Sequence, residues 1–289
     1  MSRPNLTNVP ASIRDRLLNK SKAIKRPFLE LLQYYAIERF LYRLSHSTHE
    51  QKFFLKGALM FRAWQTLNHR PTMDIDLLGK TKNTVENLET IFREVCQQQI
   101  TQDDGILFFS DTVKGKGIQT DAEYEGIRIE FKGDLNKAIV NMQIDIGFGD
   151  IITPGPQLLS YPTILNLPAP QLQGYTIESV IAEKFEAMVK RGILNSRMKD
   201  FFDIWILSRQ FTFNNNILAA AIQATFNQRG TPIDSSPECF SEEFINHPMK
   251  NGQWNSFIHK NQIELTTGTF ASVVAHIREF LVPILQKIN

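Results

Sequence analysis

Three segments of the chain alternate apolar with polar residues, and this alternation limits the possible folds more than any other feature. Segments 73–78, 127–131 and 140–146 place apolar side chains at every second position, with charged or amide side chains between them. A period of two predicts β-strands with one buried and one polar face. We therefore expect a sheet whose apolar face packs against helices and whose polar face is available for chemistry.

Apolar residues recur every three or four positions in most of the remaining chain, and this spacing is typical of helices. Helices are predicted over 28–45, 58–67, 85–98, 177–191, 199–209, 217–229 and 270–288. Short strands are predicted at 52–55 and 106–109, a hairpin connection at 114–126 and an irregular loop at 232–248. On the first of these helices Arg39 and Arg43 share a face, which we expect to be solvated.

Five of the 13 prolines lie between residues 153 and 175, a density that disfavours helices and central strands alike. The passage from a mixed first half to a helical second half is therefore predicted here. The expected fold is α+β with an α/β core: a mixed sheet flanked by helices, followed by a helical C-terminal part. The predicted divisions are a helical segment at 1–50, a core at 51–160 and a helical domain at 161–289.

Composition narrows the function only slightly. The net charge of +2 neither requires nor excludes a nucleic-acid partner, so any basic surface must come from local clustering. No segment has the ~18 to 20 consecutive apolar residues of a membrane span, and residues 1–10 lack an apolar signal core. Cys96 and Cys239 are far apart and are expected to be free thiols, so the predicted location is the cytoplasm.

Asp74 and Asp76 occupy alternate positions of a predicted strand, so their side chains leave the same face of the sheet. Two like charges at that separation repel unless a cation lies between them, and a hard divalent ion such as Mg²⁺ or Mn²⁺ suits carboxylate oxygens. Asp145 lies on the polar face of another predicted strand. If the two strands are neighbours, three carboxylates converge, where metal ions could hold a triphosphate. The alternative is solvated charge at a strand edge.

Gly57 stands in a predicted turn between a strand and a helix, where backbone N–H groups can approach phosphate oxygens closely. Lys56 and Arg62 flank this turn and could contact the same phosphates. The alternative for Gly57 is a plain strand-to-helix turn.

A second cluster of charged residues lies in the predicted helical half. Lys184 points along the apolar stripe of its helix, so it must either reach water or meet an anion. Asp200 and Asp203 share a helix face, and Asp203 has apolar neighbours along the chain, so it needs a partner such as Lys184 or Arg197. Segment 184–209 contains six basic and three acidic residues and is the best candidate for a polyanion-binding surface, with exposed helix charge as the alternative.

Taken together, these motifs resemble the AbiEii/AbiGii toxin family within the polymerase-beta-like nucleotidyltransferase superfamily. The resemblance is carried by Lys56-Gly57-Ala58, Arg70-Pro-Thr-Met-Asp74-Ile-Asp76-Leu-Leu-Gly79, Gln143-Ile-Asp145-Ile-Gly-Phe-Gly-Asp150, Ala182-Glu-Lys184-Phe-Glu-Ala187 and Ser196-Arg-Met-Lys-Asp200-Phe-Phe-Asp203. The superfamily often has Ser after the turn glycine, whereas this chain has Ala58.

The resemblance implies a nucleotidyltransferase core at 51–160 and transfer of a nucleotide from a nucleoside triphosphate to RNA, in some members to the tRNA acceptor end. It also implies a role in a toxin–antitoxin or phage-defence system, with a winged-helix DNA-binding antitoxin as partner. By motif, Asp74 and Asp76 become metal ligands, Lys184 a triphosphate contact and Asp200 a catalytic-site acid. Asp145 matches the third carboxylate, with Asp150 as a second candidate for that position.

The remaining expected nucleotide contacts are Lys56, Gly57, Arg62, Arg197, Lys199 and Asp203. Two other functions are compatible with the same motifs. One is a metal-dependent phosphoesterase that uses the same carboxylates, and the other is a non-catalytic nucleotide-binding protein of the same fold.

Overall fold

The structure is a computed structural model, and it describes residues 8–67, 70–121, 124–263 and 268–288. The chain forms two compact units. The first comprises residues 1–63, 72–149 and 158–174, and the second comprises 64–71, 150–157 and 175–289. The three-part division predicted from the sequence remains a prediction about domain boundaries.

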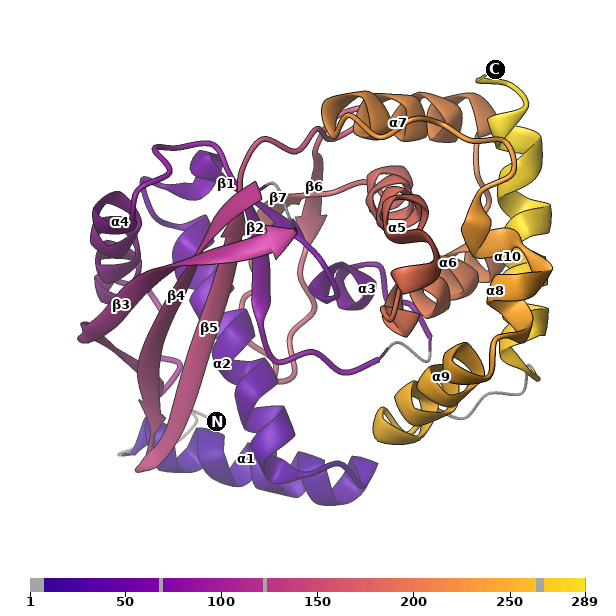
Figure 1. Ribbon diagram of the computed structural model, residues 1–289. Coiled ribbons are helices and arrows are strands. Elements are labelled where there is room, and N and C mark those ends of the chain that lie inside the picture. Colours follow the sequence, from indigo (N-terminus) through magenta and orange to yellow (C-terminus); the bar gives the residue numbers. More distant parts are fainter. Residues whose placement is uncertain (1–7, 68–69, 122–123, 264–267, 289) are drawn as a thin grey trace. The chain divides into compact units, whose positions relative to one another are not determined.

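Among the described residues, the first unit is built on a mixed sheet of seven strands in the order β3-β4-β5-β2-β1-β7-β6 (Figure 1). The strands are β1 Phe53–Lys56, β2 Ile75–Gly79, β3 Leu107–Asp121, β4 Tyr124–Leu135, β5 Ala138–Gly147, β6 Gln157–Ser160 and β7 Gln171–Gly174. Strand β2 is parallel to β5 and antiparallel to β1. This sheet and its flanking helices confirm the predicted α+β class.

Helices cover the apolar face of the sheet. They are α1 Val9–Ile24, α2 Phe28–Ser45, α3 Leu59–Ala63 and α4 Val85–Gln97, with a 3₁₀ turn at Glu50–Lys52. Phe40 of α2 packs against Phe92 of α4 and against Phe108 and Phe131 of the sheet, with ring centroids 4.9 to 6.0 Å apart. This aromatic core explains the apolar half of the strand alternation and fixes which sheet face remains polar.

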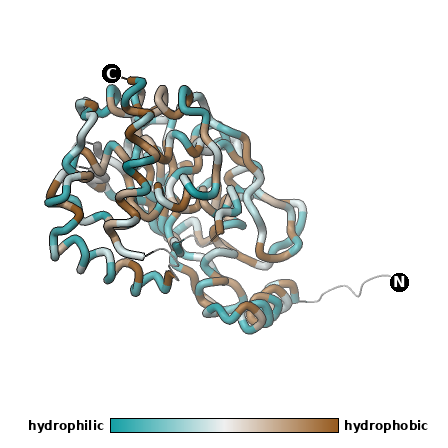
Figure 2. The backbone as a smooth tube through the Cα atoms, turned by 90° about the vertical axis from the view of Figure 1, so that its right-hand side faces the viewer, coloured by the Kyte–Doolittle hydropathy of each residue, from teal (hydrophilic) through white to brown (hydrophobic). Residues whose placement is uncertain are grey.

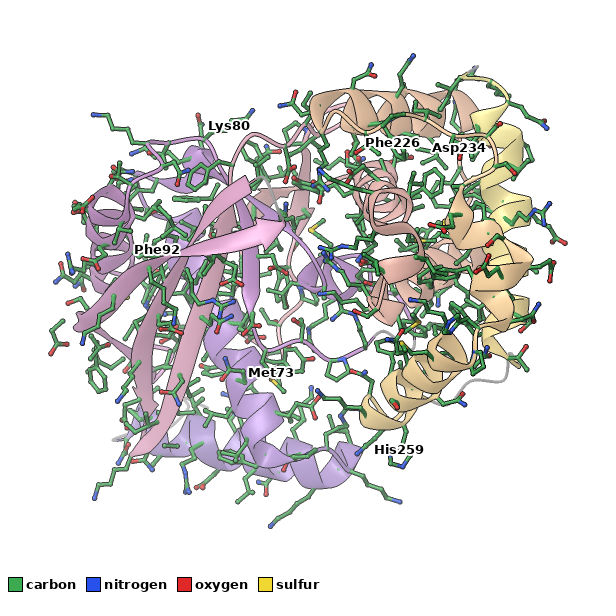
Figure 3. All side chains as sticks on the ribbon, viewed as in Figure 1. Met73, Lys80, Phe92, Phe226, Asp234 and His259 are labelled. Atoms are coloured by element: carbon green, nitrogen blue, oxygen red, sulfur yellow. The ribbon has the colours of Figure 1, made fainter. Side chains whose placement is uncertain are left out.

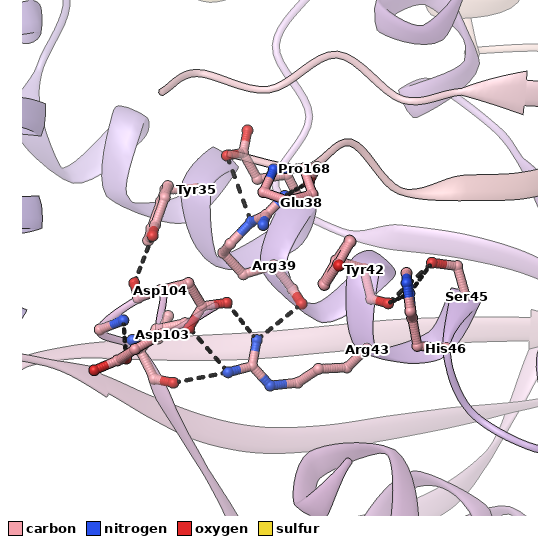
Figure 4. Close-up of polar contacts among 12 residues, drawn as sticks. Tyr35, Glu38, Arg39, Tyr42, Arg43, Ser45, His46, Asp103, Asp104 and Pro168 are labelled. Carbon is pink, nitrogen blue, oxygen red and sulfur yellow. Dashed lines mark hydrogen bonds and ion pairs between the residues drawn. The ribbon is translucent and has the colours of Figure 1, made fainter. Parts of the chain in front are cut away.

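The prediction that Arg39 and Arg43 are solvated is wrong (Figure 4). Arg43 pairs with Asp104 through contacts of 2.7 and 3.0 Å, and Arg39 donates to the Pro168 carbonyl at 2.7 Å. Periodicity failed here because the partners come from loops 61 and 129 residues away in the chain. A long side chain can be buried when its charge finds such partners.

The strand β3 is much longer than predicted, and the predicted hairpin connection at 114–126 is partly wrong because β3 continues to Asp121. Gly115 and Gly117 suggested a turn but instead pair with β4, opposite Ile129 and Ile127. A Cβ at Gly115 would lie 2.7 Å from the Val85 side chain. This glycine therefore allows α4 to approach the sheet closely.

Helix α3 also ends earlier than predicted, at Ala63 rather than near residue 67. Gln65 has a φ of 55°, which is in the left-handed region and breaks the helical path.

The second unit is helical. Its helices are α5 Ile177–Arg191, α6 Met198–Gln210, α7 Asn215–Gln228, α8 Glu242–Asn246, α9 Pro248–Lys260 and α10 Phe270–Leu285, with 3₁₀ turns at Gly192–Leu194 and Glu238–Phe240. In Figure 2 these helices alternate between hydrophobic and hydrophilic colours, as expected for helices with one buried face. No helix within the described ranges is long and apolar enough to cross a membrane.

The prediction of an irregular loop at 232–248 is partly wrong, and α9 was not predicted. Helix α8 lies inside that segment, with Ser241 as its N-cap. Helix α9 has a glycine at position 252 and only one strongly buried aromatic residue, Trp254. Its sequence therefore lacks the repeated apolar spacing by which the other helices were recognised.

Candidate active site

Four neighbouring strands of the first unit bring charged residues to one level of the sheet. Lys56 on β1 is the register partner of Asp76 on β2, and Asp76 is the partner of Asp145 on β5. Asp145 in turn is the partner of Arg128 on β4. Register partners on adjacent strands project from the same face, so this level forms a row of charged side chains on the polar face.

Gly57 is fitted to the carboxylate of Asp76. Its φ is 68°, and a Cβ built at this position would lie 2.0 Å from Asp76 Oδ2. Any other residue here would meet both backbone strain and a steric clash. The turn glycine predicted from the sequence thus allows its backbone to touch the aspartate of β2.

Asp74 precedes β2 directly and is half-buried, as is Asp76. In Figure 3 the label Met73 marks the residue immediately before Asp74, in the segment that leads into β2. Asp74 lines a cavity of about 670 Å³ in the first unit, together with Gln143, Glu130 and Lys132. One wall of this cavity is therefore the polar face of the sheet, and Asp74, one of the three predicted metal ligands, opens into it.

The structure bears directly on the predicted third carboxylate. The strands that carry Asp76 and Asp145 are neighbours, as the prediction required. Both oxygens of Asp145 are nevertheless held by Arg128, whose Nε and Nη2 each donate at 2.7 Å. The hydrogen bond to Asp145 raises the pKa of Arg128, and the charges of Asp145 and Asp74 add to this effect.

Among the described residues no group of three or more His, Cys, Asp or Glu side chains is arranged to hold a metal ion. The expected convergence of three free carboxylates is therefore not seen. The donor set that fits a divalent cation is smaller: the two half-buried, hard-oxygen carboxylates Asp74 and Asp76. The charge of Asp145 is offset by a guanidinium, so it adds little to the attraction for a metal.

The two cations expected near the Gly57 turn differ in their surroundings. Lys56 ends β1 and is half-buried, beside Asp76 in register. The Arg62 guanidinium lies 4.2 Å from the centre of the Tyr34 ring, and its Nε is buried. Arg62 is therefore packed against an aromatic residue of the same unit.

In the second unit, Lys184 on α5 meets the two aspartates of α6. Its Nζ lies 3.0 Å from Asp200 Oδ1 and 2.7 Å from Asp203 Oδ2. Arg197 pairs with Asp200 at 3.0 Å, and Arg70 pairs with Asp203 at 3.3 Å. The predicted need of Asp203 for a partner is confirmed, and Lys184 meets anions rather than reaching water.

The charges in this cluster stabilise one another. Burial alone would raise the pKa of Asp203, but Arg70 and Lys184 outweigh it and hold the pKa below its usual value. Burial alone would lower the pKa of Lys184, and Asp203 and Asp200 reverse this and raise it. We missed Arg70 as a member of the cluster, because it lies 133 residues from Asp203 and no spacing connects them.

A basic cavity lies next to this cluster within the second unit. Its volume is about 820 Å³, and its lining includes Arg70, Arg197, Lys199 and Lys260 beside the ring of Phe257. Burial lowers the pKa of Lys199, and the neighbouring charge of Arg197 lowers it further. Cations crowded in this way favour an anionic ligand.

Asp150, the second candidate for a third metal ligand, belongs to the second unit. Its Oδ1 accepts from Arg229 Nη2 at 2.8 Å, and the same guanidinium pairs with Glu186 at 2.9 Å. Nothing in the spacing of the sequence pointed to Arg229 as the partner.

Comparison with known proteins agrees with the motifs. The model of one family, described as nucleotidyl transferase AbiEii toxin of type IV toxin–antitoxin systems, matches residues 39–276. No curated protein matches the chain. The crystal structure of JHP933 from Helicobacter pylori is 12% identical, covers 86% of this chain and 89% of its own, and has a TM-score of 0.48.

Another crystal structure from H. pylori, described as a candidate nucleotidyltransferase, is 14% identical with a TM-score of 0.49. It covers 86% of this chain and 92% of its own. The family match spans most of the chain and includes the glycine turn, Asp74 and Asp76, and the Lys184 cluster. The chain is thus a member of the AbiEii family of nucleotidyltransferase toxins of type IV toxin–antitoxin systems.

Proposed function

We propose that this nucleotidyltransferase moves a nucleotide from a nucleoside triphosphate to an RNA in the cytoplasm, with the acceptor end of tRNA as the target. The observation that carries the proposal is the fit of Gly57 to Asp76. Because Gly57 has no Cβ, the turn lies directly against the Asp76 carboxylate, and a phosphate held by backbone N–H groups of this turn would lie beside that carboxylate.

For the first unit we propose that Asp74 and Asp76 hold a divalent cation, Mg²⁺ or Mn²⁺. Such an ion supplies positive charge to phosphate oxygens when bound. Lys56, one strand away from Asp76, adds a further cation beside the same carboxylate. In this mechanism an RNA hydroxyl attacks the α-phosphorus in line and pyrophosphate leaves, so the side chains contribute mainly positioning and charge neutralisation.

For the second unit we propose two roles. Lys184 is a triphosphate contact whose ammonium is aimed by Asp200 and Asp203, and Asp200 is the catalytic-site acid of the family motif. The cavity lined by Arg197 and Lys199 binds polyanion, since its basic side chains suit phosphates and Phe257 offers a surface on which a base can stack.

The test is transfer of labelled nucleotide. The full chain is incubated with each labelled nucleoside triphosphate in turn, Mg²⁺ and total RNA, and the RNA is separated on a gel. We expect label in the tRNA band with at least one nucleotide. Free labelled nucleotide without labelled RNA would instead support phosphoesterase chemistry.

Asp74→Asn is the matched test of the metal assignment, and Asp15→Asn is its control because Asp15 is exposed on α1. We expect transfer to be abolished in the first variant and unchanged in the second. Transfer by Asp74→Asn at the wild-type rate would show that the metal site lies elsewhere.

The proposed partner is an antitoxin, a winged-helix DNA-binding protein as the family resemblance implies, acting in a toxin–antitoxin or phage-defence system. Induction of the wild-type chain and of Asp74→Asn in a bacterial host, with and without the neighbouring gene, tests this. Growth arrest that requires Asp74 and is relieved by that gene is the expected result.

A further inference from the structure

The pair formed by Arg128 and Asp145 occupies the place where a third carboxylate was expected. It lies on the polar face of the sheet, beside Asp76 in register. Its side chains are 30% and 16% exposed, so the pair is partly open to solvent. Arg128 therefore adds a positive charge to the row of charged side chains for which a metal site was predicted.

Arg128 is held in one orientation. Its Nε and Nη2 donate to the two oxygens of Asp145 at 2.7 Å, which is the parallel geometry of a strong arginine–carboxylate pair. In the amide orientation that satisfies both groups, the Gln143 side-chain oxygen accepts from the same two nitrogens at 3.3 and 3.2 Å. Two neighbours on β5 thus restrain one side of the guanidinium.

Nη1, on the other side of the guanidinium, is not held by Asp145 or Gln143. Within the described part of the chain, Nη1 of Arg128 makes no hydrogen bond and no ion pair. Asp74 lies close enough for its charge to act on Arg128. A fixed donor with two N–H groups therefore stands near Asp74, one of the two carboxylates assigned to the metal.

The chemistry of Arg128 suits a phosphate ligand. A triphosphate brought to this place carries several negatively charged oxygens, and the planar, permanently charged guanidinium is well suited to such oxygens. With Asp145 holding Nε and Nη2, the N–H groups of Nη1 are the ones that can meet a phosphate oxygen.

We propose that Arg128 is a substrate-contacting residue whose Nη1 donates to a phosphate oxygen of the bound nucleoside triphosphate, and that Asp145 is a positioning residue that aims it. This inference rests on the proposed function. It assigns Asp145 to the support of Arg128 rather than to the metal.

The test measures binding of a non-hydrolysable nucleoside triphosphate analogue with Mg²⁺ to the full chain by titration calorimetry. Arg128→Gln should raise Kd about 10- to 100-fold, as expected for loss of a hydrogen bond between charged groups. Asp145→Asn should raise Kd by a smaller factor. The double variant should bind no more weakly than Arg128→Gln, because Asp145 acts only through Arg128.

Lys137→Gln is the matched control. Lys137 lies in the turn between β4 and β5 of the same sheet, and its side chain is exposed. This variant removes a cation from the sheet surface away from Arg128 and should change Kd less than twofold. Urea unfolding of every variant shows whether it is folded. If Arg128→Gln is not folded, Arg128→Lys takes its place. Arg128→Lys should also weaken binding, because a lysine cannot form the two parallel hydrogen bonds to Asp145.

The outcomes separate the two proposals. If the wild-type chain binds none of the four nucleoside triphosphates, the proposed function fails and this inference fails with it. If the wild-type chain binds but Arg128→Gln binds equally well, only this inference fails. It also fails if Asp145→Asn raises the Mg²⁺ concentration needed for half-maximal nucleotide binding while Arg128→Gln does not, since Asp145 would then be a metal ligand.

Discussion

The acidic residues at the start of β2 and those of α6 come from motifs of the same family but lie in opposite surroundings. Asp74 and Asp76 are half-buried, and Asp74 opens into a cavity. Asp200 and Asp203 have side chains only 2% and 0% exposed, and their charges are met by Lys184, Arg70 and Arg197. Membership of a motif therefore does not tell which role a carboxylate plays, and its burial and partners have to be considered.

The largest expected difference between the two regions is in activity. Asp76→Asn should reduce nucleotide transfer about 100-fold or more, because an amide is a far weaker ligand for a hard cation than a carboxylate. Its free energy of unfolding should stay close to that of the wild type. Labelled-nucleotide transfer and urea unfolding measure the two effects, and a large loss of stability would mean that Asp76 is mainly structural.

Asp203→Asn should differ from Asp76→Asn by lowering the stability of the fold. The change leaves the largely buried Lys184 and Arg70 with one negative charge fewer, and breaking a buried pair costs about 3 to 5 kcal/mol of unfolding free energy. Urea unfolding is again the measurement. The comparison would break down if this variant lost transfer while keeping the stability of the wild type.

Glu38 shows the effect of burial on a carboxyl group where it outweighs the charge of a nearby cation. It is fully buried, its Oε2 accepts from the Ile164 N–H at 2.8 Å, and Arg39 Nε is 3.7 Å away. Burial outweighs Arg39 and raises the pKa of Glu38 from 4.5 to about 8. The folded chain therefore keeps a proton on Glu38 that the unfolded chain releases, and stability falls as the pH rises from 4.5 to 8.

Glu38→Gln tests this, because glutamine resembles the protonated form and does not ionise. Relative to the variant, the wild type should lose about 3 kcal/mol of unfolding free energy between pH 5 and pH 8, on the order of 1 kcal/mol per pH unit. Urea midpoints for both chains at pH 5, 6, 7 and 8 measure the difference. If the stabilities of the two chains changed equally with pH, Glu38 would be ionised in the folded chain.

The smallest of these effects is expected at Gly57. Gly57→Ala should cost about 1 to 2 kcal/mol of stability because of its positive φ, and it should also lower transfer because Asp76 must move away from the new methyl group. Gly117→Ala is the control, since no atom lies within 4 Å of a Cβ at that position. If the two variants lost stability and transfer equally, the contact of Gly57 with Asp76 would have no special role.

The sequence predicted the parts of this molecule that depend on local patterns. The alternating segments became β2, β4 and β5, and the placement of Asp145 beside Asp76 followed from two strands being neighbours. Long-range partners could not be predicted in this way. Arg128 was visible only as a polar position in an alternating segment, and its pairing with Asp145 depends on a register that one sequence does not reveal.

The same limit explains the errors on α2 and in the second unit. Arg43 was expected in solvent because its helix face carried another arginine, whereas a loop aspartate 61 residues away neutralises it. Helix α9 was missed because its few apolar residues lack a clear period. Both depend on contacts made after the chain has folded rather than on intrinsic preference.

Strand β2 is hydrogen-bonded on both edges, to β1 on one side and to β5 on the other. Amide protons held in this way exchange with solvent only when the sheet itself opens, so they should be among the slowest in the chain. The backbone under Asp76 is therefore a stiff platform. Any adjustment needed at this strand when a substrate arrives has to come from side-chain rotation or from the substrate itself.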